Sequence, residues 1–336
     1  MFRVVAPGKI ILFGEHSVVY DKLGIAGALG INIEMSVDGA SDGFSMIRHD
    51  NREWDVKSTK DEIIEKHKKF MEVYKEKNIE EICKLNFRDA ILVVAGEVFD
   101  RYGYKDCTVE VQKGPQLKGV GGSASIFSGM AIGIAKLLGK ELNKKEINEI
   151  SYLGEVIAHA GMPSGIDNNT VVHGGYISYR KSVGVKPLQI NFRPHVVLVD
   201  SGVPANTKKT VSYVREQREA DPDVVNGILD NLDKISDWAL ECIQKKDTEK
   251  LGELMYDFYE ELRKLKISVD ELDKIIEIAK ENDFLGAKPT GGWGGGICLI
   301  LARDESEISK IRKVYEDSGF KTFVADIGVQ GARVIE

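Results

Sequence analysis

The chain lacks the features that mark extracellular, membrane-spanning and nucleic-acid-binding proteins. Its four cysteines are widely separated and form no Cys-x-x-Cys pair, which fits free, mostly buried thiols in a reducing compartment rather than a disulfide framework or a zinc site. The N-terminal segment is neither a secretory signal nor a membrane span, because polar residues interrupt its apolar runs. The net charge of −7 disfavours general binding to nucleic acids or acidic membranes. We therefore expect a cytoplasmic protein without such partners.

Internal repeats and low-complexity linkers are also absent from the 336 residues, of which 43% are apolar and 29% charged. This composition is that of an average globular protein, and the length suffices for two domains. Strand patterns are frequent in the first half, whereas helices and a further sheet dominate the second. The sequence predicts two tightly joined α+β lobes, residues 1–185 and 186–336.

Hydrophobic periodicity places the individual elements. Two short strands are expected at 2–6 and 10–15, separated by a Pro-Gly-Lys turn, and further strands at 30–37, 107–112, 195–203, 297–303, 321–327 and 332–336. Helices are expected within 59–103, at 124–139, at 143–161 with Asn143 as N-cap, three or four times within 208–281, and at 305–319. The helix at 124–139 is apolar on nearly all faces and should be buried.

A glycine–serine run, "GVGGSAS" at 119–125, directly precedes this apolar helix. A helix N-terminus offers unpaired N–H groups and a partial positive charge, which suit a phosphate, and glycines let the backbone approach it closely. The run is not a Walker A motif, because no Gly-Lys-Ser/Thr follows, and Ala124 breaks the dinucleotide pattern Gly-x-Gly-x-x-Gly. Taken alone, it fits a phosphate loop and an ordinary glycine turn equally well.

Three further segments combine polar residues with turns. The segment at 288–301 has five glycines in six positions before a strand. Each glycine costs roughly 0.5–1 kcal/mol of folding free energy, so close packing or a ligand must offset this cost. The segment at 6–20 places Lys9 on a Pro-Gly turn and Glu15 and His16 after an apolar strand, although a surface turn is an alternative. The segment at 158–176 places Asp167 in a loop, where an Asx turn or a cap is the common alternative.

In their order, "APGKIILFGEH", "GVGGSAS" and "GGWGGG" resemble the three motifs of the GHMP kinase superfamily. "GEHSVVY" is similar to the mevalonate kinase branch, since galactokinases usually carry Thr-Asp after the histidine and phosphomevalonate kinases usually lack Glu-His. "MPSGIDNNTVVHGGYISY" and "DSGVPANTKKTVSYVREQ" also resemble that branch, so the resemblance spans residues 4–300. It implies an N-terminal lobe like ribosomal protein S5 domain 2 and a ferredoxin-like C-terminal lobe.

The resemblance also implies an activity: phosphorylation of an alcohol with ATP and Mg²⁺, with mevalonate as the expected acceptor and isoprenoid biosynthesis as the pathway. Asp167 would act as base or orienting group for the hydroxyl, and Lys9 would favour the alkoxide. The phosphates would contact Lys118, Gly119, Val120, Gly121, Gly122, Ser123 and Ala124. Mg²⁺ would be held by Ser123 and Glu155, and the acceptor by Glu15, His16, Thr290 and Gly291.

Structural interpretations stay open for two of these residues. Glu155 also fits an exposed helical glutamate, and His16 a hydrogen-bonded structural histidine. His159 and His173, which flank the Asp167 segment, are both expected to be structural.

Two of the three motifs depart from the superfamily pattern. Gly122 replaces the first serine of the usual Gly-Leu-Gly-Ser-Ser-Ala, and Gly292 and Trp293 replace the second and third residues of Gly-Ala-Gly-Gly-Gly-Gly. The indole could narrow the acceptor pocket, pack on the phosphate loop or stack on a partner. The acceptor therefore stays open among mevalonate, phosphomevalonate, a sugar and another hydroxy acid, and a non-catalytic ligand-binding protein is the alternative to an enzyme. The helical region at 59–85 is a candidate lid or homodimer surface.

Overall fold

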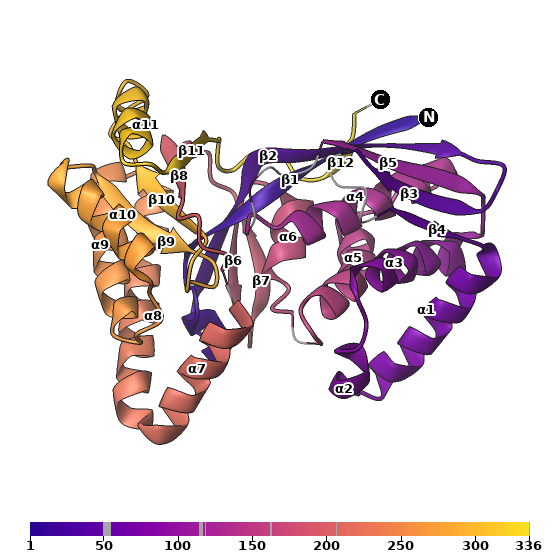
Figure 1. The fold of residues 1–336 in the computed structure, drawn as a ribbon, viewed down its shortest axis with the longest axis horizontal. Coiled ribbons are helices and arrows are strands. Elements are labelled where there is room, and N and C mark those ends of the chain that lie inside the picture. The colour runs from indigo at the N-terminus through magenta and orange to yellow at the C-terminus, as the bar shows by residue number, and fades with distance from the viewer. Residues whose placement is uncertain (50–54, 114–116, 118, 162, 206, 336) are drawn as a thin grey trace.

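The computed structural model describes residues 1–335 except 50–54, 114–116, 118, 162 and 206, and it consists of two lobes side by side (Figure 1). The first lobe holds the strands β1 (Phe2–Phe13), β2 (Gly24–Gly39), β3 (Phe44–Arg48), β4 (Val56–Ser58), β5 (Cys107–Lys113), β6 (Tyr176–Arg180) and β7 (Gly184–Leu188). Its helices are the 3-10 turn η1 (Ser17–Tyr20), α1 (Lys60–Lys75), α2 (Ile79–Ile82), α3 (Phe87–Tyr102), α4 (Gly122–Leu137), α5 (Lys144–Ala158) and α6 (Ile166–His173).

The second lobe holds the strands β8 (Val196–Asp200), β9 (Gly286–Thr290), β10 (Ile297–Leu301) and β11 (Lys321–Val324). Its helices are α7 (Thr207–Ala220), α8 (Pro222–Lys245), α9 (Thr248–Arg263), α10 (Asp270–Glu281) and α11 (Glu307–Asp317). The described part of the 208–281 region thus contains four helices, the upper of the two expected numbers. The last strand, β12 (Arg333–Val334), returns to the first lobe and pairs with β1.

The first lobe's sheet is built on β1, which is continuous rather than two strands. Its described strands follow the order β12-β1-β2-β5-β3-β4, with β6 on β2 and β7 on β6. The expected break at Pro7 is wrong: the chain keeps its pairing with β2 through a register shift between Ala6 and Gly8. Proline has no N–H to donate, and a bulge is where a strand tolerates it. The bulge places Lys9 in the middle of a long strand.

Helices cover one face of this sheet (Figure 1). Helix α4, buried along most of its length as expected, packs on β1 and β2, and α3 and α5 pack against it. Asn143 caps α5 as predicted: its side chain accepts from the Glu146 N–H while the Glu146 carboxylate accepts from the Asn143 N–H. The apolar helix that follows the glycine run is therefore fixed against the central strands.

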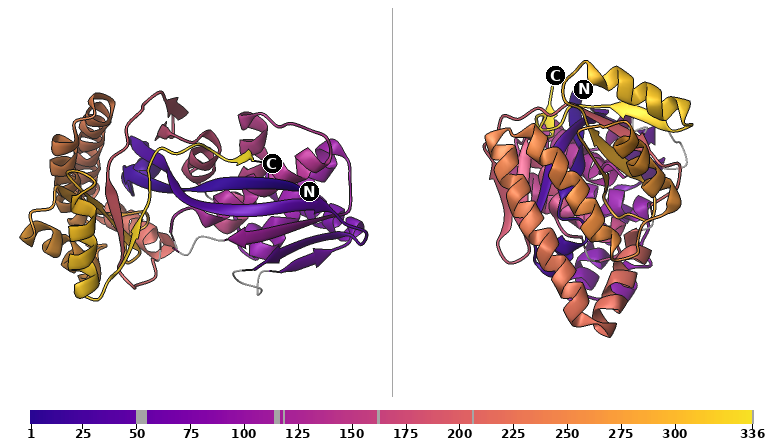
Figure 2. Two further views of the ribbon diagram at one scale, coloured as in Figure 1. Left: turned by 90° about the horizontal axis from the view of Figure 1, so that it is seen from above. Right: turned by 90° about the vertical axis from the view of Figure 1, so that its left-hand side faces the viewer.

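The two lobes share an apolar core. The second lobe's antiparallel sheet has the order β11-β8-β10-β9, and its core continues into the end of β1, where Phe13 meets Phe258 of α9 edge to face at 5.4 Å. The long strands β1 and β2 run from the first lobe toward the second (Figure 2). The expectation of tightly joined lobes is confirmed, and the site is built where β1 reaches the second lobe.

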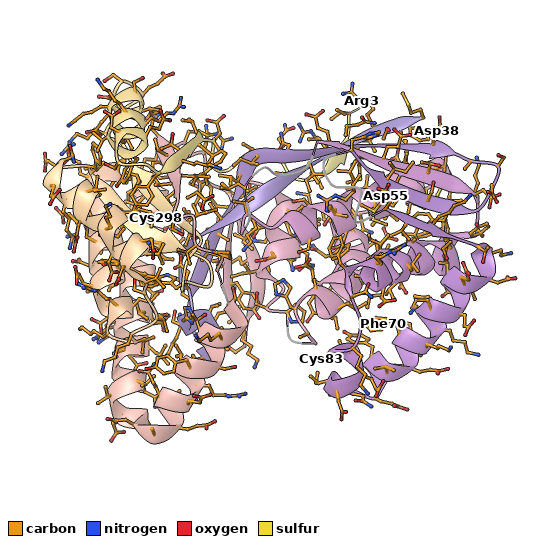
Figure 3. The ribbon with its side chains drawn as sticks, in the orientation of Figure 1. Arg3, Asp38, Asp55, Phe70, Cys83 and Cys298 are labelled. Atoms are coloured by element: carbon orange, nitrogen blue, oxygen red, sulfur yellow. The ribbon has the colours of Figure 1, made fainter. Side chains whose placement is uncertain are left out.

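All four cysteines are free thiols: Cys83 is exposed, whereas Cys107, Cys242 and Cys298 are buried. Cys83 and Cys298 lie in different lobes (Figure 3). The prediction of free, mostly buried thiols is thereby confirmed. Among the helices that the structure describes, none combines the length and apolarity that crossing a bilayer demands.

Candidate active site

The glycine run docks directly on the bulge of β1. The Lys9 N–H donates to the Val120 carbonyl at 2.7 Å, and the Ser125 hydroxyl donates to the Pro7 carbonyl at 2.6 Å. A side chain at Gly8 would place its Cβ 2.8 Å from the Val120 carbonyl oxygen, so only glycine permits this approach. The bulge at Pro7 and Gly8, in place of the turn expected from the sequence, is therefore the platform on which the glycine run rests.

Helix α4 begins at this platform with no side-chain cap. Gly121 is its N-cap residue, with φ of +80°, a conformation that side chains rarely adopt. Gly122 and Ser123 are half-buried, and Ala124 is fully buried. Because no capping side chain occupies the N-terminus, its N–H groups are available to an anion. Lys118, expected to contact the same phosphates, lies outside the described residues.

The Lys9 side chain runs along Gly121 toward Asp167. Its Nζ lies 3.0 Å from Asp167 Oδ1, with the two side chains only 8% and 18% exposed. Contrary to expectation, Asp167 is not in a loop: it occupies the first turn of α6, whose N-cap is Gly165 with φ of +82°. The sequence "PSG" suggested a loop because eight helical residues, with little amphipathic pattern, are too short to produce a periodic signal.

Glu155 and His159 lie beside Asp167 and come from the last turns of α5. Ligand atoms of the three residues lie within 4.8 Å of one another. Glu155 is 1% exposed, and its Oε1 has no hydrogen-bond partner in the structure. Its Oε2 lies 3.1 Å from His159 Nε2, and this hydrogen bond raises the pKa of His159. Glu155 is thus not the exposed helical glutamate that the sequence allowed.

The second lobe contacts the end of β1 through residues of the third motif. Thr290 donates from its hydroxyl to the Ile11 carbonyl at 2.7 Å, and His16 Nε2 lies 3.0 Å from the Gly292 carbonyl. His16 is 5% exposed and adopts a φ of +60°, and burial lowers its pKa to about 4. Gly291 is half-buried, with open space at the position of a Cβ. These residues line the junction of the lobes.

Glu15, also expected at the acceptor, is enclosed instead. Its side chain has no exposed surface and forms an ion pair with Lys288 of β9, which is equally buried. Burial raises the pKa of Glu15 and lowers that of Lys288. In this structure the Glu15 carboxylate is closed off from solvent and contacts Lys288.

Trp293 is not placed to stack on a partner, one of the positions suggested from the sequence. It is 0% exposed and stacks on Tyr259 of α9, with ring centroids 5.9 Å apart. The indole therefore belongs to the core of the second lobe. The backbone around it carries positive φ angles at Gly291, Trp293 and Gly294, which explains why glycine is concentrated there.

Comparison with known proteins identifies the family. Residues 89–175 match the model of the GHMP kinases N terminal domain, and residues 239–319 match that of the GHMP kinases C terminal. A mevalonate kinase of Thermococcus gammatolerans is 31% identical over 339 residues, covering 98% of this chain and 97% of the relative. The chain belongs to the GHMP kinase family.

Two further comparisons extend the match. The mevalonate kinase of Aeropyrum pernix is 29% identical, covering 99% of this chain and 98% of the relative. The crystal structure of L. major mevalonate kinase in complex with R-mevalonate superimposes with a TM-score of 0.76 at 24% identity, covering 98% of this chain and 97% of that one. The GHMP kinase fold expected from the motifs is confirmed.

The sequence did not predict two contacts at this GHMP kinase site. His159, expected to be structural, hydrogen-bonds Glu155, and its spacing of four from Glu155 at the end of α5 is the signal for this contact. Lys288 was not considered at all, and its signal is a lone charged residue in the strand "GAKPT", which is buried up to Pro289. His173, by contrast, ends α6, and burial lowers its pKa.

Proposed function

We propose that this chain is an ATP-dependent kinase that converts mevalonate to 5-phosphomevalonate. The observation that carries the proposal is the Lys9–Asp167 pair, 3.0 Å apart and packed against the open N-terminus of α4. The full-length similarity to mevalonate kinases supports the choice of acceptor. The free thiols support action in a reducing cytoplasm.

Asp167 is the proposed base or orienting group. In the transfer, the hydroxyl proton moves to the Asp167 carboxylate while the hydroxyl oxygen bonds to the γ-phosphorus and the bond to the β-phosphate oxygen breaks, releasing ADP. An alcohol needs no full prior deprotonation in a loose transition state, so a positioned carboxylate suffices. The Lys9 ammonium holds this carboxylate in place and stabilises negative charge on the attacking oxygen.

The glycine loop is the proposed phosphate cradle. Its backbone N–H groups at the start of α4 point out of the helix and are positioned by the hydrogen bonds to β1. Because this scaffold is formed before ligand arrives, it stabilises the charge on the phosphates without further reorganisation. Gly122 offers no hydroxyl and the Ser125 hydroxyl is bonded to the Pro7 carbonyl, so Ser123 is the proposed phosphate-side hydroxyl of the loop.

The proposed Mg²⁺ ligands are Glu155 and Ser123, with Asp167 nearby. The buried Glu155 Oε1 has no partner, and a carboxylate oxygen of this kind suits a hard cation that takes oxygen ligands. The donor set therefore fits Mg²⁺. When bound, the ion neutralises charge on the phosphate oxygens. Glu155 is held from the other side by His159, which fixes the carboxylate orientation.

A coupled assay of ADP release tests the proposal. Purified protein is given ATP, Mg²⁺ and, in turn, mevalonate, phosphomevalonate, galactose, homoserine or pantoate. We expect turnover with mevalonate and product identified as 5-phosphomevalonate. Turnover with another acceptor alone would replace mevalonate as the substrate, and ATP binding without any turnover would favour the non-catalytic alternative.

A further inference from the structure

We propose that Lys288 is a positioning residue for the phosphotransfer described above, a role that rests on that proposed function. From the second lobe it fixes the Glu15 carboxylate, and through it the turn formed by residues 14–16 at the end of β1.

The surroundings of Lys288 are built for a buried ammonium group. The residue is 0% exposed, and its Nζ donates to Glu15 and, at 2.8 Å, to the Pro289 carbonyl. The same Nζ lies 5.2 Å from the ring centroid of Phe258 and 5.7 Å from that of Phe13. Aromatic faces attract a cation, most strongly where water is excluded. A charge is therefore accommodated here, although a neutral core residue would cost less to bury.

Glu15 depends on Lys288 for its position. Its Oε1 pairs with Lys288, whereas its Oε2 is buried and has no hydrogen-bond partner in the structure. A buried carboxylate without a cation is strongly unfavourable and either takes up a proton or moves toward water. Removal of Lys288 would thus change both the charge and the place of Glu15.

The turn that carries Glu15 belongs to the site. It continues into His16, whose φ of +60° is uncommon for a residue with a side chain and whose ring contacts Gly292. The turn also ends the strand β1 that carries Lys9. Lys288, Thr290 and Gly292 of the second lobe each form a hydrogen bond to this turn or strand, and the one from Lys288 is ionic.

The variant Lys288→Met tests the role, since methionine fills a similar volume without charge. We expect kcat to fall at least tenfold and the KM for the acceptor to rise. The Kd for ATP should change less than threefold, because the glycine loop docks on β1 rather than on β9. Lys245→Met is the matched control: Lys245 pairs with Glu241 on the exposed surface of the same lobe, and its loss should leave kcat and KM unchanged.

A second variant keeps the test decisive if Lys288→Met does not fold. The double variant Glu15→Gln with Lys288→Met leaves no unpaired buried charge, and we expect it to fold while keeping the low kcat. Wild-type kcat and acceptor KM in either folded variant, with only a lower Tm, would overturn the positioning role.

Hydrogen exchange separates this inference from the proposed function. In the double variant, the amides of residues 14–20 and 291–296 should exchange at least tenfold faster than in the wild type, whatever the acceptor. Unchanged exchange at both segments would overturn the role of Lys288. A wild-type protein that turns over no acceptor would instead overturn the proposed function, while the exchange result would still decide the role of the pair.

Discussion

Lys9 Nζ and Asp167 Oδ1 lie 3.0 Å apart and join the bulged strand β1 to the first turn of α6. The variant Asp167→Asn keeps the size of the side chain but cannot accept the substrate proton. We expect kcat to fall by at least about 10²-fold, the scale of general acid–base contributions. Steady-state kinetics measures kcat, and calorimetry measures the Kd for ATP. This Kd should stay within about threefold of wild type, a change in binding free energy of about 0.7 kcal/mol or less.

Asp223 provides the control for this substitution, because it also lies in the first turn of a helix but is exposed in the other lobe. Asp223→Asn should keep wild-type kcat. Near-normal turnover by Asp167→Asn would remove this carboxylate from the mechanism.

The site also depends on the absence of a Cβ atom at Gly121. An alanine there would place its Cβ 2.5 Å from Lys9 Cγ, and its φ of +80° is unfavourable for any side chain. Lys9 would have to leave its place beside Asp167. We expect Gly121→Ala to lower kcat/KM at least tenfold, a barrier increase of about 1.4 kcal/mol or more, in steady-state assays.

Gly139→Ala separates strain from contact, because Gly139 also has a positive φ, +74°, but nothing lies within 4 Å of the added Cβ. Gly139→Ala should lose roughly 1 kcal/mol of unfolding free energy through strain alone, and Gly121→Ala should lose at least as much. Only Gly121→Ala should lose activity, and equal kinetics in the two variants would contradict the packing argument.

The proposed metal ligand Glu155 makes a separate prediction. Glu155→Gln keeps the shape of the side chain but removes the charge that attracts Mg²⁺. We expect the Mg²⁺ concentration for half-maximal activity to rise at least tenfold at saturating ATP. Glu149→Gln is the matched control, since Glu149 lies on the same helix, is half-exposed and pairs with Arg101. An unchanged Mg²⁺ requirement in Glu155→Gln would exclude the carboxylate as a ligand.

The sequence predicted most of the fold because the long elements carry strong local signals. Helix α4 has an apolar pattern on all faces, and α5 has a capping residue at Asn143, so both were placed within a few residues. Short elements such as β4 and β9 carry too few residues for a pattern to emerge. The continuous strand through Pro7 was missed because the bulge that tolerates proline is formed with a distant part of β2.

The site was predicted through motifs, and the motifs could not say which residues face one another. Lys9 and Asp167 were named as partners and do lie together. Glu15 stands in the same motif as His16, yet its partner Lys288 is 273 positions away, a pairing that no local pattern encodes. For Trp293 the motif suggested the acceptor pocket, the phosphate loop or a partner, but it could not show that the indole is buried in the core against Tyr259.

His16 allows a prediction on stability rather than activity. Burial without a counter-charge lowers the pKa of its imidazole from 6.5 to about 4 in the folded protein. Between these two values the unfolded chain binds more protons than the folded one, so stability falls as the pH falls. This stability is fully present well above pH 6.5, and the loss amounts to about 3 kcal/mol once the pH has fallen to the folded pKa.

The variant His16→Asn removes this titration, and asparagine is among the residues that tolerate the positive φ at position 16. Urea unfolding between pH 5 and about 6.5 measures how the unfolding free energy depends on pH. This dependence should be shallower in His16→Asn than in the wild type. The difference should reach up to about 1.4 kcal/mol per pH unit, the value for one proton. His195→Asn is the control, because His195 is exposed and its loss should leave the slope unchanged. If His16→Asn and the wild type had equal slopes, the buried imidazole would not be the neutral group whose protonation drives acid unfolding.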